Sequence, residues 1–443
     1  MSSTRRTRAQ TNRYEGFFNP RIYLERDKYL TRENLRALQK YRYKTEGQSI
    51  LEPFMNQKFW NPLTKLFNKS IFKRLSNKPN ILISLAFLFS LVSSILQFIQ
   101  CPLAKSCHKN SGQSPKSLEI FHKYFQIDHF KMVICSAINI FLYQTFEAIH
   151  IKLREKTTND QKNCALTIFF KHSLDSIVVI LHASLVLIAV GAGQEPVWMF
   201  FICLSYSIYY YISYWSSYIT DRIHFSNYDV IEAQIMAILV CLISAYFGQK
   251  WWGYGVEIHT LFSQNVYFLP KSITVRHLFI YTPSIILLLR ICRDQSRRII
   301  KGGVGPSGST VAETSVLSPG FPLIILSTLV ILIFIHPKCD LMSHYPILFS
   351  ITVALSYAKI SNKLVLAQIC RCEIEALDRS WWALFGIFLN QYFGIVVYPL
   401  ILLWVAFVWI TVDLVYYLIK IYHEIGVHLK VGLWSGKRMD KQN

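Results

Sequence analysis

Stretches of about 20 apolar residues recur along this chain and constrain its fold more than any other feature. A helix needs about 20 predominantly apolar residues to cross a bilayer. Two candidate segments are weak, one because it is short and one because it contains Asn390 and Gln391. The candidate spans are 81–99, 132–150, 173–190, 197–215, 229–247, 275–292, 321–336, 345–362, 381–395 and 399–419. We therefore predict an all-α, polytopic membrane bundle of about ten transmembrane helices.

The composition agrees with a membrane protein. Of the 443 residues 52% are hydrophobic and 16% are charged, whereas soluble domains contain about 25% charged residues. The polar, basic start of the chain predicts no removable signal peptide. The ten cysteines show no zinc-binding spacing. Cys101 and Cys107 lie in one predicted loop and form a pair that an oxidising compartment would permit, but the sequence does not decide whether they are bonded.

The distribution of Lys and Arg predicts the orientation in the membrane. With the N-terminus in the cytosol, cytosolic segments hold 36 of the 47 Lys and Arg residues, and the opposite loops hold 8. Cytosolic loops of membrane proteins are enriched in these residues. Both termini are therefore expected in the cytosol.

A cationic amphipathic helix is predicted just before the first span. Its apolar positions are Phe59, Leu63, Leu66, Phe67, Ile71 and Leu75, and basic residues lie between them. Such a helix lies in the headgroup plane of a membrane. The alternative is a helix that only packs on the first span.

These features divide the chain into five parts. We expect a cytosolic segment at 1–80, a transmembrane core at 81–300 and a flexible, glycine-rich cytosolic linker at 301–320. Residues 321–419 form C-terminal transmembrane helices and a candidate dimer interface, and 420–443 form a cytosolic tail. The net charge of +21 indicates attraction to anionic lipids. It does not indicate nucleic-acid binding, because the basic residues form no continuous soluble domain.

Ionisable residues gather where the second span ends and the third begins. They are Glu147, Lys152, Lys171, His172 and Asp175. Ionisable groups at membrane depth are energetically costly, so they indicate a functional site by default.

The segment from Tyr143 to Ser176 resembles the signature of the CDP-alcohol phosphotransferases, in the choline- and ethanolaminephosphotransferase branch. That signature reads D-x-x-D-G-x-x-A-R and, after a gap, G-x-x-x-D-x-x-x-D. Residues kept in register with the branch are Tyr143, Gln144, Thr145, Ala148, Ile149, Lys152, His172, Asp175 and Ser176. Upstream, Lys40 to Lys44, Phe59 to Asn61 and the pair Pro79-Asn80 resemble its K-Y-x-Y, F-W-N and P-N sequences.

The chain departs from this signature at most of its acidic positions. Glu147 stands at the first Asp, His150 at the second and Lys171 at the third, whereas Asp175 retains the fourth. In addition, Ile151, Arg154, Glu155 and Thr167 replace Gly, Ala, Arg and Gly.

In the family, the carboxylates hold Mg²⁺ or Mn²⁺ ions that neutralise the pyrophosphate of the CDP-alcohol, which is then attacked by the hydroxyl of diacylglycerol. Here the four positions sum to a charge of about −1 with His neutral. At ~4 Å and an effective dielectric constant of 20, each unit-charge interaction is worth ~4 kcal/mol, so a lysine at a ligand position opposes metal binding strongly. Glu147 and Asp175 are the remaining candidate metal ligands. We expect this metal site to be lost and no cofactor to be bound.

Three hypotheses follow for the function. The favoured one is a non-catalytic or regulatory relative in phospholipid biosynthesis. The second is a divergent active phosphotransferase, in which Lys171 and Lys152, together with Asn61, bind the substrate, and His172 or Asp175 acts as the base. The third is a transporter whose polar residues line a path.

The same residues also have simpler structural interpretations. Asp175 is expected to form a salt bridge with Lys171 four residues earlier, Glu147 and His150 to form helix-end hydrogen bonds, and Lys152 to belong to a positive flank. His182 is expected to be hydrogen-bonded within the bundle.

The resemblance also implies partners and a location. They are membrane lipids, diacylglycerol and a CDP-alcohol, and a second copy or an active relative as dimer partner. The location implied is the endoplasmic reticulum or the Golgi.

Overall fold

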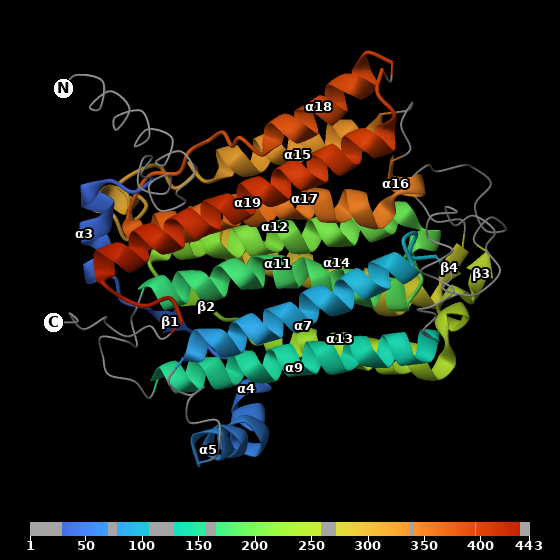
Figure 1. Ribbon diagram of the computed structural model, residues 1–443, viewed down its shortest axis with the longest axis horizontal. Helices are drawn as coiled ribbons and strands as arrows, with labels where there is room; N and C mark the ends of the chain where they lie inside the picture. Colours follow the sequence, from blue (N-terminus) through green and yellow to red (C-terminus); the bar gives the residue numbers. More distant parts are fainter. Residues whose placement is uncertain are drawn as a thin grey trace, which may run out of the picture.

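The computed structural model describes residues 29–69, 78–105, 128–155, 165–257, 272–336, 341–394 and 396–434. In these ranges the protein is a bundle of long helices that run side by side along its longest axis (Figure 1). Each of the ten predicted segments overlaps a helix. They are α7 (Pro79–Gln100), α9 (His129–Glu155), α11 (Ala165–Ala189), α12 (Pro196–Thr220), α13 (Val230–Phe247), α14 (Thr282–Ile300), α15 (Gly320–Ile335), α17 (Pro346–Cys370), α18 (Trp381–Tyr392) and α19 (Pro399–Leu429).

Six of these helices are long and apolar enough to cross a membrane, namely α7, α9, α11, α12, α13 and α19. The prediction of an all-α, multi-pass membrane protein is therefore confirmed. For α14, α15, α17 and α18, spanning remains a prediction, and α15 and α18 have only 16 and 12 residues.

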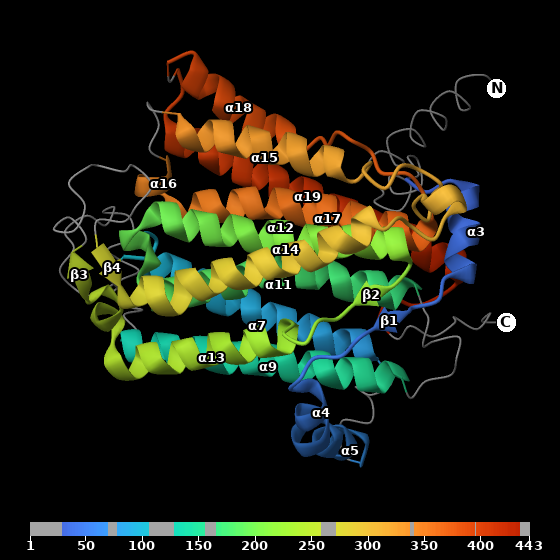
Figure 2. The same cartoon turned by 180° about the vertical axis from the view of Figure 1, so that it is seen from behind.

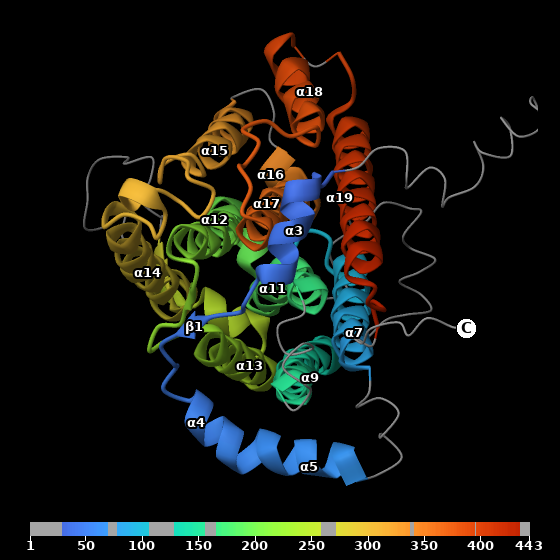
Figure 3. The ribbon, with the colours of Figure 1, turned by 90° about the vertical axis from the view of Figure 1, so that its left-hand side faces the viewer.

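Helices α11 and α17 form the centre of the bundle. Both are buried along almost their whole length, and the end-on view shows the other long helices arranged around them (Figure 3). A polar side chain on either helix is therefore surrounded by protein, so its partners must come from neighbouring helices.

Short elements mark the two ends of the bundle. The α3 end carries α3 (Arg32–Lys40) and the parallel pair β1 (Thr45–Glu46) and β2 (Ile223–His224). The opposite end, here called the β3–β4 end, carries the antiparallel pair β3 (Gly255–Glu257) and β4 (Ser272–Thr274) (Figure 2). Other short elements are η2 (Ala192–Gln194), η3 (Gln249–Gly253), η5 (His277–Tyr281), η6 (Pro306–Gly308) and α16 (Leu341–His344).

The amphipathic helix begins earlier than predicted. Elements α4 (Glu52–Met55), η1 (Asn56–Trp60) and α5 (Asn61–Lys69) follow one another without a break. They run crosswise to the long helices, outside α9 and α13 (Figure 3). Phe59 and Leu66 are exposed, as expected for side chains that contact lipid. The predicted positions Ile71 and Leu75 lie outside the described residues.

The glycine-rich segment 301–320 is fixed to the end of α12, although a flexible linker was predicted. Val304 donates a backbone hydrogen bond to Ile219 O, and the Trp215 indole donates to Val316 O. The Tyr211 hydroxyl donates to Pro319 O. These bonds satisfy backbone groups that would otherwise favour solvent exposure of the segment.

Two helix boundaries near the signature also differ from the prediction. Helix α9 continues to Glu155 instead of ending at 150, and α11 begins at Ala165 instead of 173. Lys171 and His172 were therefore predicted to precede the third span, but they lie inside its helix.

At the β3–β4 end, Cys101 is disulfide-bonded. Its candidate partner from the sequence, Cys107, lies outside the described residues.

Candidate functional site

The central feature of the signature region is an ion triad formed by Glu147, Lys171 and Asp175. The Lys171 ammonium lies 2.7 Å from Glu147 Oε1 on α9 and 2.6 Å from Asp175 Oδ2 on α11. The exposed fraction of the side chain is 10% for Lys171, 17% for Glu147 and 12% for Asp175. The predicted pair between Lys171 and Asp175 is confirmed, and Glu147 joins it from the neighbouring helix.

A tyrosine completes the contacts of Asp175. The Tyr143 hydroxyl donates a hydrogen bond of 2.7 Å to Asp175 Oδ1. Tyr143 and Glu147 lie four residues apart on α9, and Lys171 and Asp175 lie four residues apart on α11, so each pair occupies one face of its helix. Both oxygens of Asp175 are therefore engaged by protein groups.

His172 lies beside the triad and contacts α12. Its Nδ1 is 2.5 Å from the Tyr214 hydroxyl and 3.7 Å from Asp175 Oδ2. Its carbonyl accepts a hydrogen bond from the Tyr210 hydroxyl. Its Nε2 is buried and has no hydrogen-bond partner in the described part of the chain. The tyrosines thus hold the backbone and one ring nitrogen of His172.

The segment after α3 covers His172. The Tyr43 ring stacks on the His172 ring with centroids 6.2 Å apart. The Arg154 guanidinium lies over the Tyr43 ring, 4.7 Å from its centroid. The K-Y-x-Y sequence that carries part of the resemblance therefore reaches the signature region in space.

Lys152 and Asn61 form a contact of their own. The Lys152 ammonium donates a 2.8 Å hydrogen bond to Asn61 Oδ1, which links α9 to α5 in an exposed position. Lys171 instead contacts Glu147 and Asp175. The structure therefore brings together Glu147, Lys171, His172 and Asp175, and it places the other two predicted substrate-binding residues in a separate contact.

His150 also has a structural partner. Its Nε2 lies 3.1 Å from Asn80 Oδ1, and the Asn80 amide donates to Leu433 O. The predicted hydrogen bond of His150 is present, but it joins two helices and is not at a helix end, because α9 continues to Glu155. Asn80, from the P-N sequence, thereby connects α7 and α9 with the segment after α19.

The resemblance included Tyr143 and Tyr43 without predicting their contacts, and the sequence did not single out Tyr210 and Tyr214. Tyr143 had a usable signal, because it lies one helical turn before Glu147. Tyr210 and Tyr214 had none, because α12 contains many tyrosines and only the tertiary structure distinguishes these two.

The residues present do not fit the divalent ions that the signature implies. Mg²⁺ prefers oxygen ligands in near-octahedral geometry. The ammonium of Lys171 lies between the two carboxylates that would have to supply them. Among the described residues, no group of three or more His, Cys, Asp or Glu side chains is placed to hold a metal ion. A divalent ion would have to displace Lys171 from a buried position.

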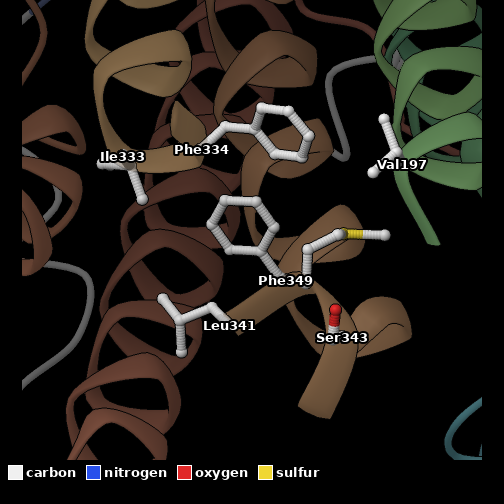
Figure 4. A pocket seen from close by; sticks show the side chains of 7 residues that line it. Val197, Ile333, Phe334, Leu341, Ser343 and Phe349 are labelled. Carbon is white, nitrogen blue, oxygen red and sulfur yellow. The ribbon is translucent and has the colours of Figure 1, made fainter. Parts of the chain in front are cut away.

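Two cavities are alternative candidate sites. An apolar pocket of about 140 Å³ lies between α12, α15, α16 and α17, where Phe334, Phe349 and Leu341 surround it (Figure 4). A narrower crevice lies next to Ser176 and Tyr210, between α11, α12 and α17. None of the residues that line the first pocket belongs to the signature-like segment from Tyr143 to Ser176.

Curated relatives cover almost the whole chain. The chain is 28% identical to cholinephosphotransferase 1 of Danio rerio over 406 residues, covering 92% of this chain and 95% of that protein. It is 29% identical to cholinephosphotransferase 1 of Xenopus laevis, covering 94% and 92%. It is 22% identical to choline/ethanolaminephosphotransferase 2 of Arabidopsis thaliana, covering 77% and 79%. No family model matches the chain.

These relatives share the length of the chain, and their names agree with the signature-like segment between α9 and α11. The chain is therefore similar along almost its whole length to choline- and ethanolaminephosphotransferases, which supports its place in the CDP-alcohol phosphotransferase family.

Proposed function

We propose that this protein is a non-catalytic or regulatory member of its family in phospholipid biosynthesis. The observation that carries the proposal is the position of Lys171 between Glu147 and Asp175. An ammonium group there neutralises one unit of charge and supplies no open coordination position for a phosphate. Metal ions carry most of the catalysis in phosphoryl transfer, so loss of their ligands removes the main source of rate enhancement.

The contacts of Asp175 also argue against a role as general base. A base must reach the proton that it accepts within hydrogen-bond distance. Asp175 already accepts bonds from Lys171 and Tyr143, one on each oxygen. Its retention is explained by the structure, because it anchors α11 to α9.

The same contacts weigh against a divergent phosphotransferase that uses lysines in place of metal. That hypothesis needs Lys171 and Lys152 to act together on the phosphates. Lys171 is engaged by two carboxylates, and Lys152 binds Asn61. The two lysines thus contact different partners.

We further propose the endoplasmic reticulum or the Golgi as the location, with both termini in the cytosol. The excess of Lys and Arg at the α3 end supports this orientation. The disulfide of Cys101 at the other end supports it as well, because disulfides persist in oxidising compartments.

Substrates and partners are proposed from the names of the relatives. A protein that keeps the family fold retains a surface that fits diacylglycerol, a CDP-alcohol or a subunit of an active relative. A regulatory role would then act through a homodimer or a heterodimer with such a relative.

A transferase assay tests the proposal. Purified protein in liposomes, given CDP-choline or CDP-ethanolamine, diacylglycerol and Mg²⁺ or Mn²⁺, should form no phospholipid. The Danio rerio cholinephosphotransferase in the same liposomes is the positive control. Turnover that is abolished by Asp175→Ala would overturn the proposal. The double variant Lys171→Asp, His150→Asp restores the two aspartates of the family signature, and its activity with Mg²⁺ or Mn²⁺ shows whether these carboxylates are what the protein lacks.

A further inference from the structure

A second buried polar cluster lies between α7, α9 and α11, toward the β3–β4 end from Lys171. Its residues are Ser90, Ser94 and Gln97 on α7, Ser136 and Asn139 on α9, and His182 on α11. All six are at most 7% exposed. In contrast, Leu88, Phe89 and Val92 of α7 are exposed. From Leu88 to Gln97, α7 thus directs polar side chains inward and apolar ones outward.

Hydrogen bonds divide this cluster into two groups. In the first, Ser90 Oγ lies 3.1 Å from His182 Nε2 and 3.4 Å from Asn139 Oδ1, to which it donates. In the second, the Gln97 amide nitrogen donates to Ser136 Oγ. The predicted hydrogen bond of His182 inside the bundle is confirmed by the first group.

Three polar atoms of the cluster have no partner among the described residues. They are Ser94 Oγ, Gln97 Oε1 and Asn139 Nδ2. Ser94 lies one turn from both Ser90 and Gln97 along α7. Asn139 lies one turn from Ser136, which Gln97 contacts. The three atoms therefore belong to adjacent turns of two helices that pack together.

The three atoms are chemically complementary to one small ligand. An amide N–H donates, an amide carbonyl accepts, and a hydroxyl does both. Leaving such groups buried and unsatisfied costs about 1–3 kcal/mol each, and lipid tails provide no hydrogen bonds. A buried water typically makes about 3 hydrogen bonds to groups of this kind.

We propose that Ser94, Gln97 and Asn139 form a binding site for water within the bundle. The water accepts from Asn139 Nδ2 and donates to Gln97 Oε1 and Ser94 Oγ, and it thereby joins the two hydrogen-bonded groups. This site ties α7 to α9 in the half of the bundle that the ion triad does not reach. It depends on none of the residues that carry the proposed function, so either proposal can fail without the other.

Radiolytic hydroxyl-radical footprinting of the full-length protein in nanodiscs, read by mass spectrometry, tests this site. Radicals formed from bound water oxidise side chains beside it, so His182 and Met132 should be labelled. Met132 lies one turn from Ser136, whose hydroxyl donates to its carbonyl. Met199 is equally buried within the apolar core. Methionine reacts with hydroxyl radicals faster than histidine does. If His182 is labelled and Met199 is not, the difference therefore reflects water beside His182 and not the reactivity of the side chain. His182 as unlabelled as Met199 overturns the proposal.

Variants locate the water. Asn139→Leu removes the donor, and it should reduce labelling of His182 to the level of Met199. Ile138→Ala, on the exposed side of the same helix, is the matched control and should leave the labelling unchanged. If Asn139→Leu does not fold, as judged by size-exclusion chromatography, Ser94→Ala serves as the smaller change. Unaltered labelling in a folded variant of either residue overturns the assignment.

Discussion

The Lys171 ammonium lies 2.7 Å from the Glu147 carboxylate, and this ion pair joins α11 to α9. The same ammonium binds Asp175 at 2.6 Å. One lysine thus compensates the charge of two carboxylates, one on each helix. Under the proposed function, this ammonium takes the place of a bound metal ion.

The first prediction concerns stability. Lys171→Met leaves Glu147 and Asp175 without their cation in a buried position, and removing one partner of a buried pair destabilises by about 3–5 kcal/mol. Thermal unfolding in detergent should show a clear loss. The control is Lys131→Met, because Lys131 pairs with Asp128 on the surface, where its side chain is 70% exposed. Equal melting temperatures for the two variants would contradict the structural role of Lys171.

The second prediction concerns ligand binding in the absence of metal. If the protein retains affinity for CDP, binding should persist in EDTA, because Lys171 and not a divalent ion occupies the site. Titration calorimetry with and without chelator measures this. The variant Lys171→Asp, His150→Asp is the matched comparison, and its CDP binding should become sensitive to EDTA. Loss of wild-type binding in chelator would indicate a retained metal.

The third prediction concerns a second ion network, between α17, α19 and the loop before α18. Asp378 in that loop lies 2.9 Å from Lys359 and 2.7 Å from Lys363. Burial raises the pKa of the Asp378 carboxyl, but the two lysines outweigh burial and hold that pKa below its usual value. Asp378→Asn should therefore destabilise the protein by about 1.5–3 kcal/mol at pH 7.

The sign of the pKa shift sets the pH dependence. Since the folded-state pKa is depressed, the contribution of Asp378 is fully present above its unfolded pKa of about 3.9 and is lost as pH falls through the folded value. The stability difference between wild type and Asp378→Asn should thus shrink below about pH 4. Asp128→Asn, at a surface pair, should show little difference at any pH. A constant difference across the acid range would contradict the assignment.

The fourth prediction concerns topology. A reporter fused after Asn443 should be accessible to protease or antibody when only the plasma membrane of a cell is permeabilised. The reason is the concentration of Lys and Arg on one side. Glycosylation of a C-terminal acceptor site would place that end in the lumen and reverse the proposed orientation.

Much of the fold could be predicted from the sequence, because each long helix is a continuous apolar stretch that a bilayer requires. The ends of helices were less predictable. The sequence around Lys171, His172 and Asp175 appears too polar for a span, yet these groups are satisfied by Glu147, Tyr143 and Tyr214 from other helices. Contacts between helices that satisfy buried polar groups in this way produce no pattern in the local sequence.

The candidate site was predictable in part. The pair formed by Lys171 and Asp175 follows from their spacing of four residues, and the resemblance placed Glu147 near them. The contact of Tyr43 with His172 was not predictable, because it joins residues far apart in the chain through a segment with no periodicity of its own. The start of the amphipathic helix at Glu52 was not predicted, although Pro53 lies in its first turn, a position that proline favours.

The most direct test of the central claim is Mn²⁺ binding to the purified wild-type protein, measured by electron paramagnetic resonance in titrations beside Asp175→Ala. We predict that wild type and Asp175→Ala bind Mn²⁺ equally weakly, because Lys171 already neutralises the carboxylates. Stoichiometric binding by the wild type that disappears in Asp175→Ala would contradict this account and restore a metal-dependent site between α9 and α11.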